Sequence, residues 1–147
     1  MNPPIFEVCS ADSVVQARLG NPARLYPFGE AEPNQTRPYA VWQIVGGTPE
    51  NYLDCPPDID GMSVQVDSYA TSAALARSVA QALRDSIEPV AHITRWGGET
   101  RDKETNLYRY SFDVDWLVPR YPKPKPKPKP KPAHAGFFMS EEKRNYP

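Results

Sequence analysis

MSVQVDSYATSAALARSVAQALRDSIEP, from Met62 to Pro89, decides the fold, because its apolar repeat changes from that of a strand to that of a helix. Over 62–69 the residues Met62, Val64 and Val66 alternate with polar ones, which is typical of a strand with one buried face. After Thr71, which we expect to cap a helix, apolar side chains recur every four residues. They are Leu75, Val79, Leu83 and Ile87, widened by Ala76 and Ala80. The segment predicts a half-buried strand and then an amphipathic helix over 71–88 that covers one face of a sheet.

Three other segments have the composition of strands. YAVWQIV over 39–45 is rich in aromatic and β-branched residues and is expected to end at the Gly-Gly pair that follows it. VAHITRW over 90–96 is similar, and the polar stretch 97–106 is expected to form a hairpin connection. Over 108–118 every even-numbered residue is apolar. We therefore expect an α+β fold in which an antiparallel or mixed sheet of about four strands has its helices packed on one face.

The connecting segments are marked by capping residues, prolines and glycines. Residues 4–19 predict two short helices or one broken helix, because the capping cluster Ser10 to Ser13 interrupts the helical spacing. Gly20 ends this pattern, and four prolines over 20–38 predict a long loop. The pair Asp60-Gly61 is expected to form a turn before the next strand.

Charge divides the chain into an acidic body and a basic tail. Residues 1–120 carry ten Lys/Arg and sixteen Asp/Glu, whereas residues 121–147 carry seven Lys/Arg and two Glu. Nucleic-acid binding depends on clustered cations, so the acidic body argues against a domain that grips phosphates. No apolar run approaches the roughly 20 residues that span a bilayer. The N-terminus also lacks the pattern of a signal peptide, so we expect a cytoplasmic site of synthesis and no membrane partner.

The titratable residues do not form a recognisable catalytic or metal-binding set. The candidates are Cys9, Cys55, His92, His134 and the acidic group Asp54, Asp58 and Asp60. Both cysteines are expected to be free thiols, with Cys9 in the core, and His92 is expected to be a partly buried strand residue. The acidic group lacks the ligand spacing of a calcium loop and is better explained as a solvated loop. We therefore expect no enzyme activity, no cofactor and no metal.

The tail contains KPKPKPKPKP over 123–132, which predicts an extended polyproline II linker. Residues 121–132 would reach about 37 Å at roughly 3.1 Å per residue. We expect three parts, an α+β domain over 1–120, this linker, and a tail with an apolar anchor over 133–147. The expected partner-binding residues are Lys123, Lys125, Lys127, Lys129 and Lys131 in the linker and Phe137, Phe138 and Met139 in the anchor. A purely solubilising tail and a proline-rich peptide ligand remain open alternatives.

Several segments, taken in order, resemble the tail terminator (tail completion) family of tailed bacteriophages over roughly residues 3–118. These segments are DSVVQARLG (12–20), RLYP (24–27), PYAVW (38–42), VQVDSY (64–69) with the helix after it (71–88), and LYRYSFDVDW (107–116). No single motif is specific, so the resemblance rests on their order. The Lys-Pro tail departs from the family pattern.

The resemblance implies a structural virion protein of the tail-neck region, assembled in the host cytoplasm. Family members look like subunits of a ring, usually a hexamer, that caps the tail tube. Such a ring would contact the major tail tube protein and present a surface to the head-tail connector or head-completion protein. Genome DNA would pass through it without specific binding, which the acidic body fits independently. Two alternatives remain, a head-closure or connector neck protein and a small cellular adaptor that recruits a partner through its Lys-Pro tail.

Overall fold

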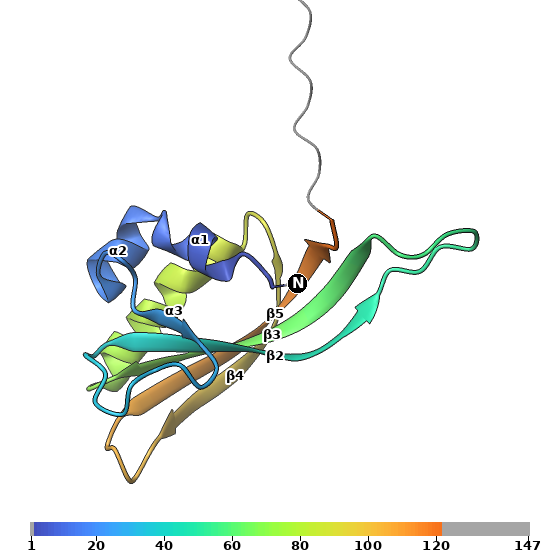
Figure 1. Ribbon diagram of the computed structural model, residues 1–147. Coiled ribbons are helices and arrows are strands. Elements are labelled where there is room, and N and C mark those ends of the chain that lie inside the picture. Colours follow the sequence, from blue (N-terminus) through green and yellow to red (C-terminus); the bar gives the residue numbers. More distant parts are fainter. Residues whose placement is uncertain (1, 122–147) are drawn as a thin grey trace, which may run out of the picture.

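The computed structural model describes residues 2–121, which form a five-stranded sheet with helices on one of its faces (Figure 1). The elements are α1 (Ile5–Ser10), α2 (Ser13–Leu19), β1 (Leu25–Pro27), β2 (Tyr39–Pro49), β3 (Ile59–Ala70), α3 (Ala73–Ile87), β4 (His92–Arg101) and β5 (Tyr108–Pro119). The strand order is β1-β2-β3-β5-β4; β1 pairs parallel with β2 and the other pairs are antiparallel. The predicted α+β class with a mixed sheet is confirmed, with one strand more than expected.

Polar side chains cap the N-termini of α2 and α3. The carboxylate of Asp12 accepts hydrogen bonds from the amides of Val14 (2.8 Å) and Val15 (3.4 Å), so α2 starts separately from α1. The cap of α3 is Ser72 rather than the predicted Thr71. Ser72 has the extended backbone of an N-cap, and its hydroxyl accepts from the amide of Leu75 at 3.2 Å. This difference moves the helix start by one residue without changing the face that the helix buries.

The core lies between α3 and the sheet, as the two apolar repeats predict. Val79, Leu83 and Ile87 of α3 are completely buried, whereas Leu75 is only partly buried. The even-numbered face of β5 contributes Phe112, Val114, Trp116 and Val118, and β3 contributes Met62, Val64 and Val66. Helices α1 and α2 close one side of this layer with Ile5, Cys9, Val15 and Leu19.

The predicted ends of two strands are wrong because glycine pairs lie inside the strands. β2 continues beyond Gly46 and Gly47 to Pro49, with a register shift after Ile44. A Cβ atom on Gly47 would lie 2.5 Å from the carbonyl oxygen of Gly61, so the two backbones approach too closely for any side chain. Gly61 and its neighbour Asp60 are accordingly part of β3 and do not form the predicted turn.

A similar correction applies to β4, which continues through Gly97 and Gly98 to Arg101. The positive φ of Gly98 (94°) accompanies a register shift against β5, and the β4–β5 turn contains only residues 102–107. The predicted long loop over 20–38 also contains an element that the sequence did not indicate, the short strand β1. Its position is fixed because the amide of Ala40 donates to the carbonyl of Arg24 at 2.9 Å.

Candidate functional site

The sheet face opposite the helices is mainly polar, with Leu117 as an exposed apolar exception, and its two arginines are paired with carboxylates. Asp67 accepts from Arg109 at 3.1 Å, and Asp113 lies 3.5 Å from Arg95. The hydroxyl of Ser63 donates to the carboxylate of Asp115 across the β3–β5 pair at 3.2 Å. Both arginines on this face therefore have a carboxylate partner. Such a face can remain in contact with water, and within residues 2–121 it offers no unpaired guanidinium group to a phosphate.

The outer edge of β4 is protected against pairing with another strand. Two irregularities interrupt its register with β5, after Ile93 and after Trp96, and charged residues such as Arg95 and Glu99 lie along it. Bulges and charges of this kind discourage strand addition at a sheet edge. At the opposite edge, β1 is three residues long and ends in Pro27. Contacts with neighbouring molecules are therefore expected through side chains rather than through a continued sheet.

The connection between β2 and β3 projects beyond the helices (Figure 1), and we call residues 45–61 the hairpin arm. At its base, Arg120 donates two hydrogen bonds to Asp60, at 3.0 and 2.9 Å, which lower the pKa of that carboxyl group. Toward its tip, the hydroxyl of Tyr52 donates to Asp58 at 3.0 Å, and this hydrogen bond raises the pKa of Tyr52. Leu53, at the tip, is fully exposed.

The prediction of a solvated acidic loop holds for two of its three carboxylates. Asp54 and Asp58 are exposed, whereas Asp60 is buried against Arg120. Across residues 2–121 no group of three or more His, Cys, Asp or Glu side chains is placed to hold a metal ion. The arm is therefore acidic at its tip and anchored to the sheet by an ion pair at its base.

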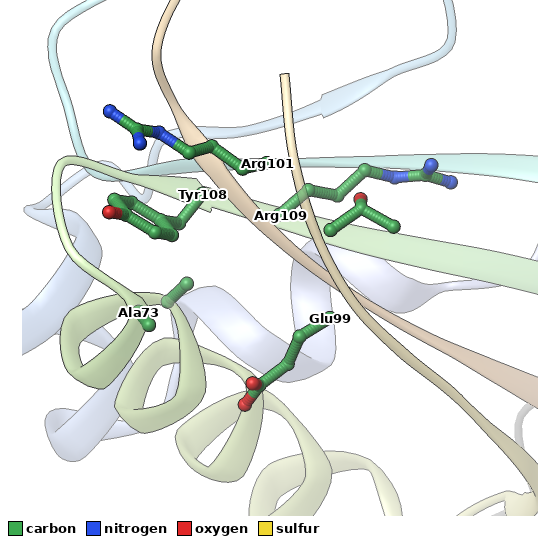
Figure 2. Close-up of a pocket in the computed structure, with 7 residues that line it drawn as sticks. Ala73, Glu99, Arg101, Tyr108 and Arg109 are labelled. Carbon is green, nitrogen blue, oxygen red and sulfur yellow. The ribbon is translucent and has the colours of Figure 1, made fainter. Parts of the chain in front are cut away.

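A second surface feature is a hollow of about 230 Å³, which we call the end hollow (Figure 2). It is lined by Ala73, Ala76, Glu99, Thr100, Arg101, Tyr108 and Arg109. The guanidinium group of Arg101 lies 5.1 Å from the centre of the Tyr108 ring, an arrangement visible in Figure 2. Arg101 also donates to the side chain of Asn106 at 3.0 Å, and Glu99 is paired with Arg77 from α3 at 2.6 Å. The hollow thus combines small and aromatic apolar side chains with a charged rim, on which Glu99 and Arg109 are paired with neighbours and Arg101 is in contact with Tyr108.

The hairpin arm and the end hollow lie at opposite ends of the sheet. Ile59, where the arm joins β3, is paired with Pro119 at the end of β5. The other end of β5 begins at Tyr108, which is paired with Arg101 in the hollow. The β2–β3 connection and the β4–β5 turn accordingly appear at opposite ends of the sheet in Figure 1.

Among the cysteines and histidines singled out from the sequence, Cys9, Cys55 and His92 do not line the end hollow, and of these three only Cys55 lies in the arm. Cys9 is a buried free thiol, as predicted; burial raises its pKa to about 11, and its sulfur accepts from Ser86. Cys55 is an exposed free thiol in the arm. His92 was predicted to be partly buried but is exposed, because it is the first residue of β4, at the sheet edge. His134 lies outside the described residues.

The predicted partner-binding residues of the tail also lie outside the described part of the chain. They are Lys123, Lys125, Lys127, Lys129, Lys131, Phe137, Phe138 and Met139. The arm and the hollow were not identified from the sequence as binding surfaces. One available signal was the absence of Lys and Arg from residues 38–76, a stretch that contains five Asp or Glu. None of the helices within residues 2–121 has the length and hydropathy needed to span a membrane.

Comparisons with known proteins identify related sequences and folds. A family model described as "Tail completion protein gp17" matches residues 3–119. Among solved structures, a chain from the "Virion of native gene transfer agent (GTA) particle" has a TM-score of 0.63 at 13% sequence identity, over 78% of this chain and 91% of that one. At this identity the likeness concerns the fold. A search of curated proteins found no match.

Proposed function

The chain belongs to the family described as Tail completion protein gp17, a structural component of phage virions, and we propose that its copies form a closed hexameric ring at the end of the tail tube. Its role is tail completion rather than catalysis. The ring would bind the major tail tube protein on one side. Its other side would receive the head-tail connector or head-completion protein.

The observation that carries this proposal is the uncovered, polar face of the sheet. The helices bury only one face, and the two arginines of the other face are already paired, Arg109 with Asp67 and Arg95 with Asp113. A surface of this kind suits a water-filled passage through which DNA moves. Phosphates are held by available Lys and Arg side chains, and pairing with carboxylates leaves few for that purpose. We therefore place this face toward the lumen of the ring.

The acidic balance of the whole body supports the same arrangement. Sixteen Asp or Glu residues against ten Lys or Arg residues over 1–120 give an excess of negative charge. Such an excess opposes retention of DNA inside the ring at moderate ionic strength. A subunit that gripped DNA would instead need a basic patch on one face.

Electron microscopy of the full chain mixed with isolated tail tubes tests the proposal. We expect a closed ring of about six copies at one end of each tube, and native mass spectrometry of the released ring should give the copy number. Binding to DNA-filled heads without binding to tubes would instead identify a head-closure or connector protein. A chain that stays monomeric both alone and with tubes would refute the ring.

A further inference from the structure

The tip of the hairpin arm carries exposed side chains that suit insertion into a site on a neighbouring molecule. Leu53 is fully exposed, and Tyr52 beside it is half exposed. The adjacent Asp54 is exposed, and no hydrogen bond or ion pair engages its side chain among the described residues. The tip therefore presents one large aliphatic side chain next to one available carboxylate. A complementary site would offer an apolar hollow beside a cation.

The end hollow has these two properties. Ala73, Ala76 and Tyr108 provide apolar surface, and the volume of about 230 Å³ exceeds that of an apolar cavity of roughly 150 Å³ that can hold benzene. Arg101 on the rim contacts Tyr108 and Asn106, but among residues 2–121 it forms no ion pair with a carboxylate. Its charge is therefore available to an acidic partner.

One copy cannot join its own arm to its own hollow. β3 and β5 pair over twelve residues between these two features, a length of roughly 36 Å at about 3.3 Å per residue. The arm also extends away from the hollow, beyond the far end of the sheet (Figure 1). An arm that enters the hollow must therefore belong to another molecule, and the matching apolar and charged groups favour a second copy of this chain.

We propose that the arm of one copy binds the end hollow of the next, with Leu53 inserted beside Tyr108 and Asp54 paired with Arg101. This inference rests on the proposed ring and specifies the contact that closes it. The contact is heterologous, because two different surfaces meet, and repetition around an axis produces a closed ring when the rotation allows it. The pairing of Asp54 with Arg101 gives the contact its direction, whereas burial of Leu53 provides most of the affinity.

The exposed thiol near the arm tip provides a direct test in the full chain. Cys55 lies two residues from Leu53, and Cys9 is buried, so oxidation should act selectively at position 55. Thr100→Cys places a second thiol in the wall of the hollow. Mild oxidation of assembled rings should link position 55 of one copy to position 100 of the next. Peptide mass spectrometry should identify that linkage, and a gel without reductant should show species larger than dimers.

Two controls identify unrelated linkages. The parent chain can form only dimers through Cys55, and Thr100→Cys combined with Cys55→Ser can form only dimers through position 100. Rings that are intact by electron microscopy but give no linkage between positions 55 and 100 would overturn this inference while leaving the ring in place. Absence of any ring on tail tubes would instead refute the proposed function itself.

Charge exchange tests the predicted ion pair. Asp54→Arg and Arg101→Asp should each weaken subunit association, and the double variant should recover most of the loss, since the two charges would again be opposite. Leu53→Ser should weaken association about tenfold or more. Val14→Ser is the matched control, because Val14 is an exposed aliphatic residue on α2 that belongs neither to the arm nor to the lining of the hollow. Failure of the double variant to recover, with each variant melting like the parent, would overturn the pairing.

Discussion

Replacement of Leu83 tests the packing on which both proposals depend. Leu83 lies in the last two turns of α3, has no exposed surface and belongs to the main core cluster with Phe112 and Val114 of β5. Leu83→Ala removes buried aliphatic atoms and leaves a cavity between the helix and the sheet. Such changes reduce the free energy of unfolding by roughly 2–5 kcal/mol.

This loss is large relative to the stability of a domain of this size. Small domains unfold with a free energy of about 5–15 kcal/mol, so Leu83→Ala should leave a folded but weakened protein. A reduction of about 3 kcal/mol corresponds to a fall in the melting temperature of roughly 10 °C. Leu83→Asp should have a larger effect and prevent stable folding, because it places an unpaired carboxylate in the same apolar site.

Urea denaturation of the full chain, followed by circular dichroism, measures both effects. The midpoint for Leu83→Ala should fall without a change in slope, since the same surface is exposed on unfolding. Gln81→Ala is the control, because Gln81 is on the exposed side of the same helix, and its midpoint should stay within the error of the parent. If Leu83→Asp melts like the parent, the face of α3 that contacts the sheet has been misassigned.

Two further predictions concern the base of the arm and the tail. Arg120 lowers the pKa of Asp60 in the folded protein, so the stability from this pair is present above the unfolded pKa of about 3.9 and is lost as pH falls through the lower folded value. Arg120→Gln should therefore reduce stability at pH 7, and its difference from the parent should disappear in strong acid; a constant difference at all pH values would contradict the assignment. For the tail, changing Phe137 and Phe138 to Ser should weaken ring-to-tube attachment or head-tail joining, while replacement of the five linker lysines by Gln should mainly alter its salt dependence. If deletion of residues 121–147 leaves phage yield and particle stability unchanged, the tail is a solubilising extension.

The sequence predicted the elements whose burial follows a regular repeat. Over 62–89 the apolar period changes from two to four residues, and the structure places β3 and α3 there with the expected faces in the core. The even-numbered apolar face of β5 was predicted for the same reason. Regular burial leaves a periodic signal in the sequence, because every second side chain of a strand, or about every fourth of a helix, points toward the same buried face.

The errors occurred where a local signal had a long-range explanation. Gly46-Gly47 and Gly97-Gly98 are typical chain breakers, but here they permit close backbone approach or a bulge inside paired strands. Neither role can be read without knowing which backbone lies opposite. Strand β1 was missed because three residues in a proline-rich loop carry no repeat, and only their pairing with β2 makes them a strand.

The candidate site was harder to predict, because a surface that binds a partner has no reason to follow a period. Leu53 lies in the polar, proline-containing stretch between two strands, where a single apolar residue is ordinary. It becomes informative only when the structure shows it fully exposed at the end of an acidic arm, with an apolar hollow and an arginine at the other end of the same sheet. Complementarity between two surfaces of one chain depends on where the fold places them. The hypothesis of a head-to-tail contact therefore depends on the strand register, which separates the arm and the hollow of one copy. A disulfide between position 55 of one copy and position 100 of the next would test that hypothesis directly.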